Sequence, residues 1–260
     1  MTNIPFFQVD AFVTHRPLTG NPAAVMPLER WLDDTVLQAI AAENNLSETA
    51  FTVPSEDAGV DYDLRWFTPT VEVDLCGHAS LASGHVLLKG DRVRFATKSG
   101  VLTVSRNGDL LELDLPAHAV ERQDLPGLAD ALGVSGETFL GRSGNGAAIM
   151  LLENEEAVRA VSPDFAALCA FDRLVIVTAH GDEQDVASRV FAAYHGIDED
   201  PVTGSAHAAL TPFWAERLGR SRFTALQASK RGGILDCRLE EDRVILGGRC
   251  ATTIVGTFQL

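Results

Sequence analysis

The sequence has few basic residues and no long apolar run, and each shortage excludes a class of protein. Lysine and arginine together number 21 against 36 aspartates and glutamates, which gives a net charge of −15. Nucleic-acid binding needs clustered Lys and Arg to neutralise phosphates, and anionic membrane surfaces repel an acidic chain. The longest apolar stretches are far shorter than a membrane span. We therefore expect neither a nucleic-acid partner nor a membrane partner.

Cysteine is also scarce, and its four positions are widely spaced: Cys76, Cys169, Cys237 and Cys250. A secreted disulfide scaffold is shorter and richer in cysteine. No CxxC pair or Cys/His cluster has the spacing of zinc ligands, so no metal site is predicted. The first residues lack the basic and apolar regions of a signal peptide. The expectation is a cytoplasmic protein with reduced thiols.

Strand and helix signals alternate along the chain. Strands are predicted at 6–13, 49–53, 62–66, 147–152, 174–178, 188–194 and 253–260, helices at 36–41, 79–88 and 205–218, and hairpins at 101–115 and 234–246. The first hairpin turns at Asn107-Gly108, a dipeptide that favours tight turns. The segment Gly141-Arg-Ser-Gly-Asn-Gly146 fits neither common nucleotide-binding pattern and is predicted to be a turn.

The chain carries an internal repeat. Arg65-Trp-Phe precedes Cys76-Gly-His-Ala, and about half the chain later Arg189-Val-Phe precedes Thr203-Gly-Ser-Ala. The two hairpins recur in the same order. This pattern predicts two similar halves of the α+β class, with the proline-containing segment 115–127 as the linker.

Each repeat places a glycine at the start of a helix. Gly77 and Gly204 let a ligand approach the backbone, and the next amides, including that of Ser205, point along the helix axis. The first amides of a helix lack partners within it and carry partial positive charge, so they bind anions. The matched pair favours a carboxylate substrate. For either turn alone, an ordinary helix start is the better interpretation.

Three ionisable residues near these turns are candidates for proton transfer. Glu48 lies where a loop enters a strand, Asp200 precedes the second turn, and His78 follows Gly77. An imidazole titrates near neutrality, and a buried carboxylate can hold a proton. The alternatives are a solvated Glu48, a capping Asp200 and a purely hydrogen-bonded His78.

Cys76 is a further candidate, because a helix N-terminus lowers a thiol pKa. The matching position in the second half is Thr203, so a mechanism with two opposed thiols is not available.

Five motifs, in order and across most of the chain, resemble the PhzF-like family of phenazine biosynthesis. They are Gly20-Asn-Pro-Ala-Ala-Val25, Asn45-Leu-Ser-Glu-Thr-Ala-Phe51, Phe67-Thr-Pro, Glu72-Val-Asp-Leu-Cys-Gly-His-Ala79 and Glu199-Asp-Pro-Val-Thr-Gly-Ser-Ala-His207. The resemblance implies a diaminopimelate-epimerase-like fold, in which each half is a mostly antiparallel, barrel-like sheet curled around a central helix and the active site lies between the halves. It implies domains at 1–117, joined by the final strand 251–260, and at 118–250.

The resemblance also implies a cofactor-independent isomerase that forms a homodimer. In the family, a glutamate moves a proton between carbons of a small dihydro-hydroxyanthranilate-like carboxylate. Carried over by motif, the catalytic residues are Glu48, His78 and Asp200, and the substrate-binding residues are Gly77, Gly204 and Ser205. Two alternatives stay open: a non-catalytic protein that binds small carboxylates, and an epimerase that uses the single thiol of Cys76.

Two residues depart from the patterns expected at their positions, one from that of a regular helix and one from that of the family. Pro212 lies inside the second predicted helix and should kink it or remove one backbone hydrogen bond. Ala228 stands where the family usually has glycine, which affects the shape of the substrate pocket.

Overall fold

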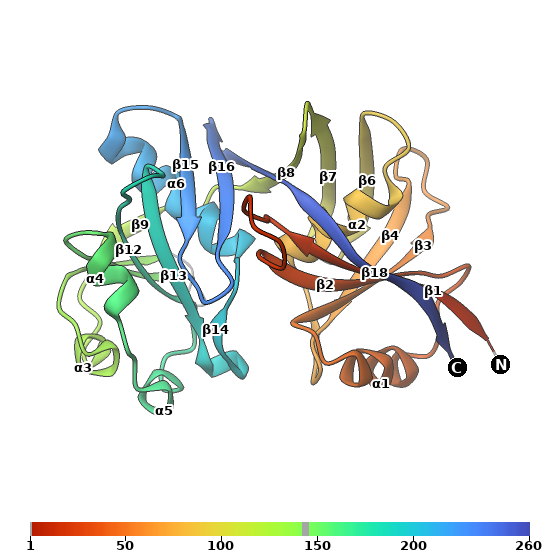
Figure 1. The fold of residues 1–260 in the computed structure, drawn as a ribbon, viewed down its shortest axis with the longest axis horizontal. Coiled ribbons are helices and arrows are strands. Elements are labelled where there is room, and N and C mark those ends of the chain that lie inside the picture. Colours follow the sequence, from red (N-terminus) through yellow and green to blue (C-terminus); the bar gives the residue numbers. More distant parts are fainter. Residues whose placement is uncertain (1, 142–145) are drawn as a thin grey trace. The chain divides into compact units, whose positions relative to one another are not determined.

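A computed structural model describes residues 2–141 and 146–260, and the middle of the predicted glycine-rich turn, 142–145, lies outside them. The chain divides into two compact units, Met1–Asp114 with Gly247–Leu260 and Leu115–Leu246. The boundaries expected from the sequence differ from these by a few residues. The elements of both units are labelled in Figure 1.

The first unit contains a curled sheet and two helices. Its elements are β1 (Asn3–Ala11), β2 (Asn21–Pro27), α1 (Asp34–Asn44), β3 (Glu48–Pro54), β4 (Tyr62–Phe67), β5 (Glu72–Val73), α2 (Gly77–Leu87), β6 (Arg92–Thr97), β7 (Gly100–Asn107), β8 (Leu110–Pro116) and β18 (Cys250–Gln259).

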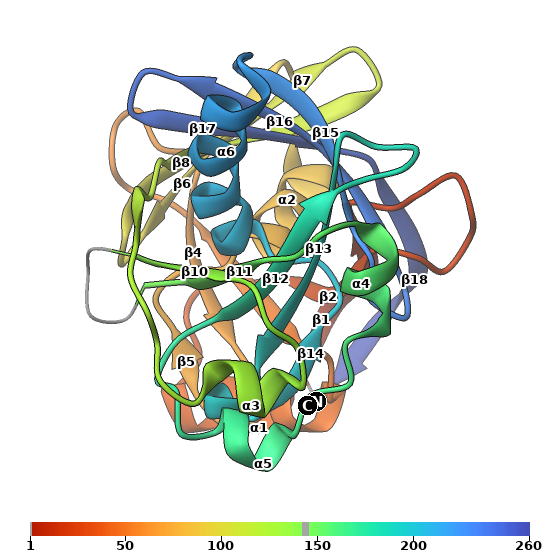
Figure 2. The ribbon, with the colours of Figure 1, turned by 90° about the vertical axis from the view of Figure 1, so that its left-hand side faces the viewer.

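The second unit repeats this composition with extra short helices (Figure 2). Its elements are β9 (Val120–Arg122), α3 (Leu128–Leu132), β10 (Glu137–Gly141), β11 (Ala148–Leu151), α4 (Glu155–Ala160), α5 (Phe165–Leu168), β12 (Val175–His180), β13 (Val186–Ala192), the 3-10 turn η1 (Ala193–His195), β14 (Ile197–Asp200), α6 (Gly204–Leu218), β15 (Arg222–Gln227), β16 (Gly233–Glu240) and β17 (Arg243–Gly248).

The order of strand pairings is the same in both units. In the first, β1 and β2 are antiparallel, β2 and β3 parallel, β3 and β4 antiparallel, and β4 pairs with both β5 (antiparallel) and β6 (parallel). In the second, β10 to β15 repeat each of these steps with the same directions. The α+β class and the two similar halves are therefore confirmed. The curled sheet stays open in the described part of the chain.

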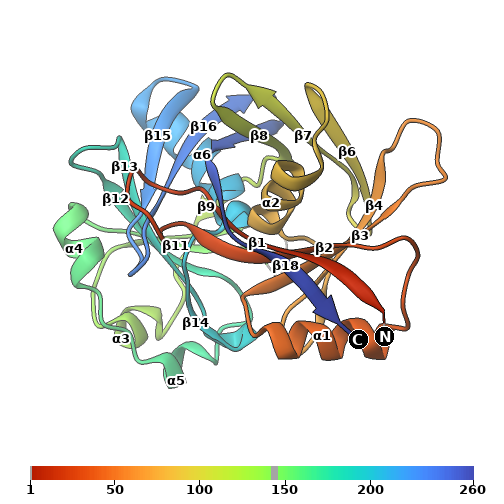
Figure 3. The ribbon, with the colours of Figure 1, turned by 45° about the vertical axis from the view of Figure 1, so that its right-hand side comes forward.

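A buried helix lies inside each curled sheet. Every residue of α2 from Gly77 to Gly84 is buried, and strands β1, β2, β3, β6, β7 and β18 pack around it (Figure 3). A helix enclosed on all sides needs small or apolar residues all round rather than on one stripe. The run Ala79-Ser-Leu-Ala-Ser-Gly84 meets this requirement. The same holds for α6, most of whose residues are buried.

Pro212 leaves α6 continuous from Gly204 to Leu218. Proline has no amide proton, so it cannot bond the carbonyl four residues earlier, that of Ala208. In the structure the amide of His118 donates to this carbonyl over 3.0 Å. The lost helical bond is therefore replaced by one from the segment that follows β8, and the buried carbonyl keeps a partner.

An Arg–Glu pair stands ahead of each helix. Arg65 binds Glu72 through two hydrogen bonds of 2.7 and 3.0 Å, and Arg189 binds Glu199 through two of the same lengths. Each guanidinium also lies over a phenylalanine two positions later, Phe67 or Phe191. Bidentate arginine–carboxylate pairs of this kind fix the relative orientation of the two side chains as well as balancing their charges. Each pair therefore anchors the short strand that leads into its helix.

The first of these pairs predicts an acid-sensitive contribution to stability. Arg65 holds the pKa of Glu72 at about 2, below its ordinary 4.5. Because the folded-state pKa is depressed, the stabilisation is complete above pH 4.5 and is lost as the pH falls towards 2. The Glu72 side chain is 17% exposed, so solvent partly screens the ion pair. We therefore expect a contribution of about 2 kcal/mol to the unfolding free energy, less than the full pKa shift would give.

Urea unfolding at a series of pH values from 7 to 2.5 measures this contribution. Glu72→Gln should remove about 2 kcal/mol of the acid-dependent change in unfolding free energy. Asp74→Asn is the matched control, since the Asp74 side chain is 78% exposed. Identical pH profiles for wild type and Glu72→Gln would contradict the prediction.

Most predicted elements are present. The predicted hairpins are β7–β8, with Gly108 at φ +58°, and β16–β17. The strand predicted at 188–194 ends at Ala192, where the chain enters η1. The sequence patterns missed β2, β5, β6, β9, β10, β14, β15 and the short helices of the second unit. Among the described residues, no helix is both long and apolar enough to cross a membrane.

Candidate active site

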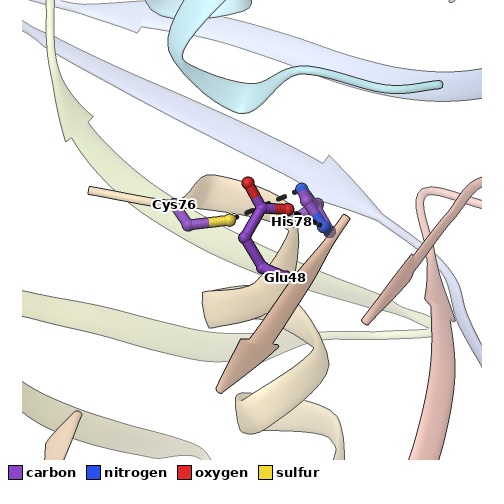
Figure 4. Close-up of side chains that lie close together, drawn as sticks. All are labelled: Glu48, Cys76 and His78. Carbon is purple, nitrogen blue, oxygen red and sulfur yellow. Dashed lines mark hydrogen bonds and ion pairs between the residues drawn. The ribbon is translucent and has the colours of Figure 1, made fainter. Parts of the chain in front are cut away.

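Three of the residues singled out in the sequence come together in the first unit: Glu48, Cys76 and His78 (Figure 4). Helix α1 ends at Asn44, the left-handed Asn45 turns the chain, and Glu48 is the first residue of β3. Cys76 is the N-cap of α2, and His78 is its second residue. The parallel pairing of β2 with β3, which packs both strands on α2, places the loop carboxylate beside the start of the helix.

The imidazole of His78 is the centre of the cluster. Its Nε2 lies 3.1 Å from Glu48 Oε2, and its Nδ1 lies 3.5 Å from Cys76 Sγ. His78 is 3% exposed and the Glu48 side chain 13% exposed. The solvated-loop interpretation of Glu48 is therefore wrong, because most of its side chain is removed from water.

The contact between Glu48 and His78 is close but not aligned as a hydrogen bond. Within residues 2–141 and 146–260, neither Glu48 Oε2 nor His78 Nε2 has a hydrogen-bond partner of good geometry, although both atoms are buried. Buried polar atoms nearly always have such partners, and the exceptions concentrate at functional sites. Catalytic hydrogen bonds are often loose before substrate binds. Glu48 and His78 are therefore placed close enough to exchange a proton, and their facing atoms are available to a ligand.

Asn21, the first residue of β2, completes the surroundings of the ring. It is fully buried, and its side-chain Nδ2 lies 3.1 Å from His78 Nδ1. The sequence interpretation missed this role although Asn21 stands in a quoted motif. A polar residue between glycine and proline at the start of an otherwise apolar strand was the available signal.

The surroundings shift the pKa values of the cluster. Burial raises the pKa of the Cys76 thiol to about 11, and the charge of Glu48 adds to the effect. The lowering expected from the helix N-terminus is therefore outweighed, and the thiol stays protonated at neutral pH. Burial lowers the pKa of His78, but charge on Cys76 and Glu48 raises it, and the net direction is upward. The larger of these two charges, that on Cys76, is absent at neutral pH because the thiol keeps its hydrogen, and the amide donor of Asn21 at Nδ1 opposes a second ring proton.

The three side chains carry atoms that can bind metals, and these atoms lie within 4.8 Å of one another. Glu48 and Cys76, however, approach different nitrogens of the ring, so no single ring lone pair is directed at both. A protonated thiol is also a poor ligand. The arrangement fits a hydrogen-bonded relay better than a metal centre.

The second unit holds the other predicted residues at the start of α6. Asp200 is buried, and its carboxylate accepts a short hydrogen bond from the Thr203 hydroxyl. The fully buried Gln227 accepts from the Thr203 amide over 2.8 Å and donates to the Asp200 carbonyl over 2.7 Å. Gly204 and Ser205 follow as the first residues of α6. The site prediction overlooked Gln227, which fixes the N-cap by bonds that no local pattern reveals.

His207 has a structural role. Its Nδ1 donates to the Thr203 carbonyl over 2.9 Å, and burial lowers its pKa to about 4, so the ring is neutral near pH 7. Ala228 is buried, and its amide donates to the Ser188 carbonyl over 2.7 Å.

Comparison with known proteins places the chain in a family. The family model described as phenazine biosynthesis-like protein (PhzC-PhzF) matches residues 9–256. An uncharacterized isomerase of Pseudomonas aeruginosa is 49% identical, with 99% of each chain covered. A crystal structure of a PhzF-family phenazine biosynthesis protein from Enterococcus faecalis has 45% identity and a TM-score of 0.92, with both chains fully covered.

A hydroxyproline epimerase from Agrobacterium vitis shares the fold alone. Its TM-score is 0.66 at 12% identity, and the match covers 99% of this chain and 91% of that one. This likeness agrees with the epimerase-like fold implied by the motifs. The family model and the relatives that match over nearly the whole chain lead to one assignment: the chain belongs to the phenazine biosynthesis-like (PhzC-PhzF) family and is an enzyme of the isomerase class.

Proposed function

We propose that the protein moves a proton between two carbons of a small carboxylate substrate without a cofactor, with Glu48 as the general acid and base. Glu48 removes a proton from a C–H bond, whose electron pair enters the neighbouring conjugated system. The same proton, or one exchanged with solvent, then returns to another carbon of that system, and the carboxylate is restored. A dihydro-hydroxyanthranilate-like acid, as in the family, has the conjugation that this step requires.

One observation carries the proposal: a mostly buried carboxylate faces a buried imidazole at 3.1 Å, and the facing atoms have no aligned hydrogen bond in the described chain. A carboxyl group can take up a proton and give it back, and a nearby imidazole offers an exchange partner for that proton. A group that can both hold and release a proton is what an isomerisation through one acid/base residue requires. The Gly77 amide, at the start of α2, is proposed to bind the substrate's carboxylate.

A screen in deuterated water tests the proposal. The wild-type protein is incubated with cyclic and amino-acid carboxylates, and mass spectrometry follows both conversion and deuterium incorporation at carbon. We expect conversion of at least one conjugated cyclic acid, with deuterium at the carbon that receives the proton. Binding of such acids without conversion or exchange would instead support the alternative, a non-catalytic carboxylate-binding protein.

The other alternative, a one-thiol epimerase, makes a different prediction. Because the pKa of Cys76 is about 11, fewer than about one thiol in a thousand is ionised at pH 7.5. We expect Cys76→Ala to keep at least about half of the wild-type rate of deuterium exchange. We also expect iodoacetamide at this pH to modify the exposed Cys169 far faster than Cys76.

Peptide mapping by mass spectrometry identifies the labelled cysteine, and Cys237→Ala serves as the control because that thiol is also buried and its pKa is about 12. Loss of exchange in Cys76→Ala alone would favour the epimerase. The assignments of Asp200 to catalysis, and of Gly204 and Ser205 to substrate binding, stay predictions. The same is true of the homodimer and of a cytoplasmic location.

A further inference from the structure

We propose that Asn21 is a positioning residue for the proton relay: its side-chain amide keeps Nδ1 of His78 unprotonated, so that the single ring proton lies on Nε2, facing Glu48. The inference deepens the proposed function and rests on it for its kinetic consequence alone. The state of the ring can be observed without any substrate.

The contacts around the ring carry this proposal. Asn21 Nδ2 lies 3.1 Å from Nδ1, and an amide nitrogen is a donor only. Cys76 Sγ lies 3.5 Å from the same nitrogen. The Cys76 thiol retains its hydrogen at neutral pH and is therefore a second donor towards Nδ1. Two donors directed at one ring nitrogen require it to accept, and a neutral imidazole that accepts at Nδ1 carries its hydrogen at Nε2.

The position of Asn21 is itself fixed by the backbone. Asn21 pairs with Ala11 in the β1–β2 ladder, and Gly20 before it has φ +78°. A side chain at Gly20 would overlap the Ala11 carbonyl oxygen. Pro22, which follows, pairs with Asp10 and restricts the chain on the other side. Asn21 thus sits on a rigid strand end and is fully buried, as a residue that orients another side chain must be.

The consequence is a defined direction for the relay. With Nδ1 occupied, the imidazole interacts with Glu48 only through Nε2, at 3.1 Å from Oε2. The partial positive charge of the Nε2 hydrogen then favours the Glu48 carboxylate electrostatically, before Glu48 takes the substrate's proton. If Nδ1 carried the hydrogen instead, a lone pair at Nε2 would face the carboxylate and repel it. Asn21 therefore sets the starting state of the base through the imidazole ring, which lies close to both residues.

Nitrogen NMR of protein labelled with ¹⁵N-histidine tests this directly. Two-bond proton–nitrogen spectra at pH 7 show which ring nitrogens are protonated, and the His78 pattern is identified by its absence in His78→Gln. We expect a neutral His78 ring protonated at Nε2. A ring protonated at Nδ1, or at both nitrogens, would overturn the proposal.

Asn21→Asp changes the amide donor into a carboxylate acceptor with almost the same shape. We expect His78 to become protonated at Nδ1, and kcat to fall roughly 10- to 100-fold with little change in KM. Asn44→Asp is the matched control: Asn44 is half-buried in the same unit and bonds Thr49, not the ring. Its His78 spectrum should match that of the wild type.

Asn21→Leu gives a second test if the charged variant folds poorly, since it removes the donor without adding charge. We expect its His78 to lose the strict Nε2 preference. An unchanged tautomer in both variants would overturn the role of Asn21. A failure of the proposed function looks different, because the tautomer result would stand while Glu48→Gln kept full proton exchange.

Discussion

Glu48→Gln should lower the rate of substrate isomerisation by about 10²- to 10⁴-fold, the range that general acid–base residues contribute. Glutamine has the shape of glutamate, so the start of β3 and the packing near His78 should survive. An amide at this position cannot accept a proton from carbon or return one. The same variant should lose deuterium incorporation to the same degree, because exchange and isomerisation share the proton-removal step.

Conversion and deuterium content are measured together by mass spectrometry, and thermal unfolding shows that the variant is folded. Glu43→Gln is the matched control, since Glu43 is an exposed residue of α1 only a few positions away. It should behave as the wild type. Unchanged exchange in a folded Glu48→Gln protein would rule out Glu48 as the acid/base residue.

The largest effect on stability is expected for Gly20→Ala. Its φ of +78° lies in the left-handed region, which costs an L-residue roughly 1–2 kcal/mol. The added Cβ would also overlap the Ala11 carbonyl oxygen and lie 3.1 Å from the Val13 amide nitrogen. These neighbours are backbone atoms and cannot rotate away, so we expect a further loss of about 1–3 kcal/mol.

Urea denaturation gives the change in unfolding free energy. Gly108→Ala separates the two effects, because Gly108 has φ +58° in the β7–β8 turn and a Cβ there would meet no atom within 4 Å. It should lose only the conformational part, about 1 kcal/mol. Equal losses at the two positions would mean that the Ala11 carbonyl moves aside at little cost. A folded Gly20→Ala should also show a disturbed His78 ring, since Gly20 leads into Asn21.

Local patterns predicted those parts of the fold that depend on local interactions. The Asn107-Gly108 turn and the helix starts at Gly77 and Gly204 follow from the conformations these residues favour. The internal repeat strengthened these predictions, because the glycine turn and the hairpin recur in the same order in both halves. The same repeat predicted two similar halves, and the matching order of strand pairings in the two units agrees with that prediction.

The missed elements have physical reasons. β2 begins with Asn21-Pro22 and ends at Pro27, and proline is a signal against a strand. Here the sheet tolerates both prolines because the ladder to β1 begins at Asn21 and that to β3 ends at Pro27. The contact between Asn21 and His78 joins residues 57 positions apart, so no local spacing reveals it. The burial of Glu48 likewise depends on how the sheet curls around α2.

The two Arg–Glu pairs have a consequence for how the chemistry of this scaffold can change. Both halves carry the same bidentate pair, with its glutamate four positions before the helix N-cap, yet the N-cap residue differs, Cys76 in one half and Thr203 in the other. In each half, the Arg–Glu pair that holds the turn is thus a different set of residues from the N-cap position whose side chain varies. A designer who wishes to install a thiol at position 203 or a hydroxyl at position 76 inherits a turn that is already held in place, and needs to redesign only the immediate neighbours of the new side chain.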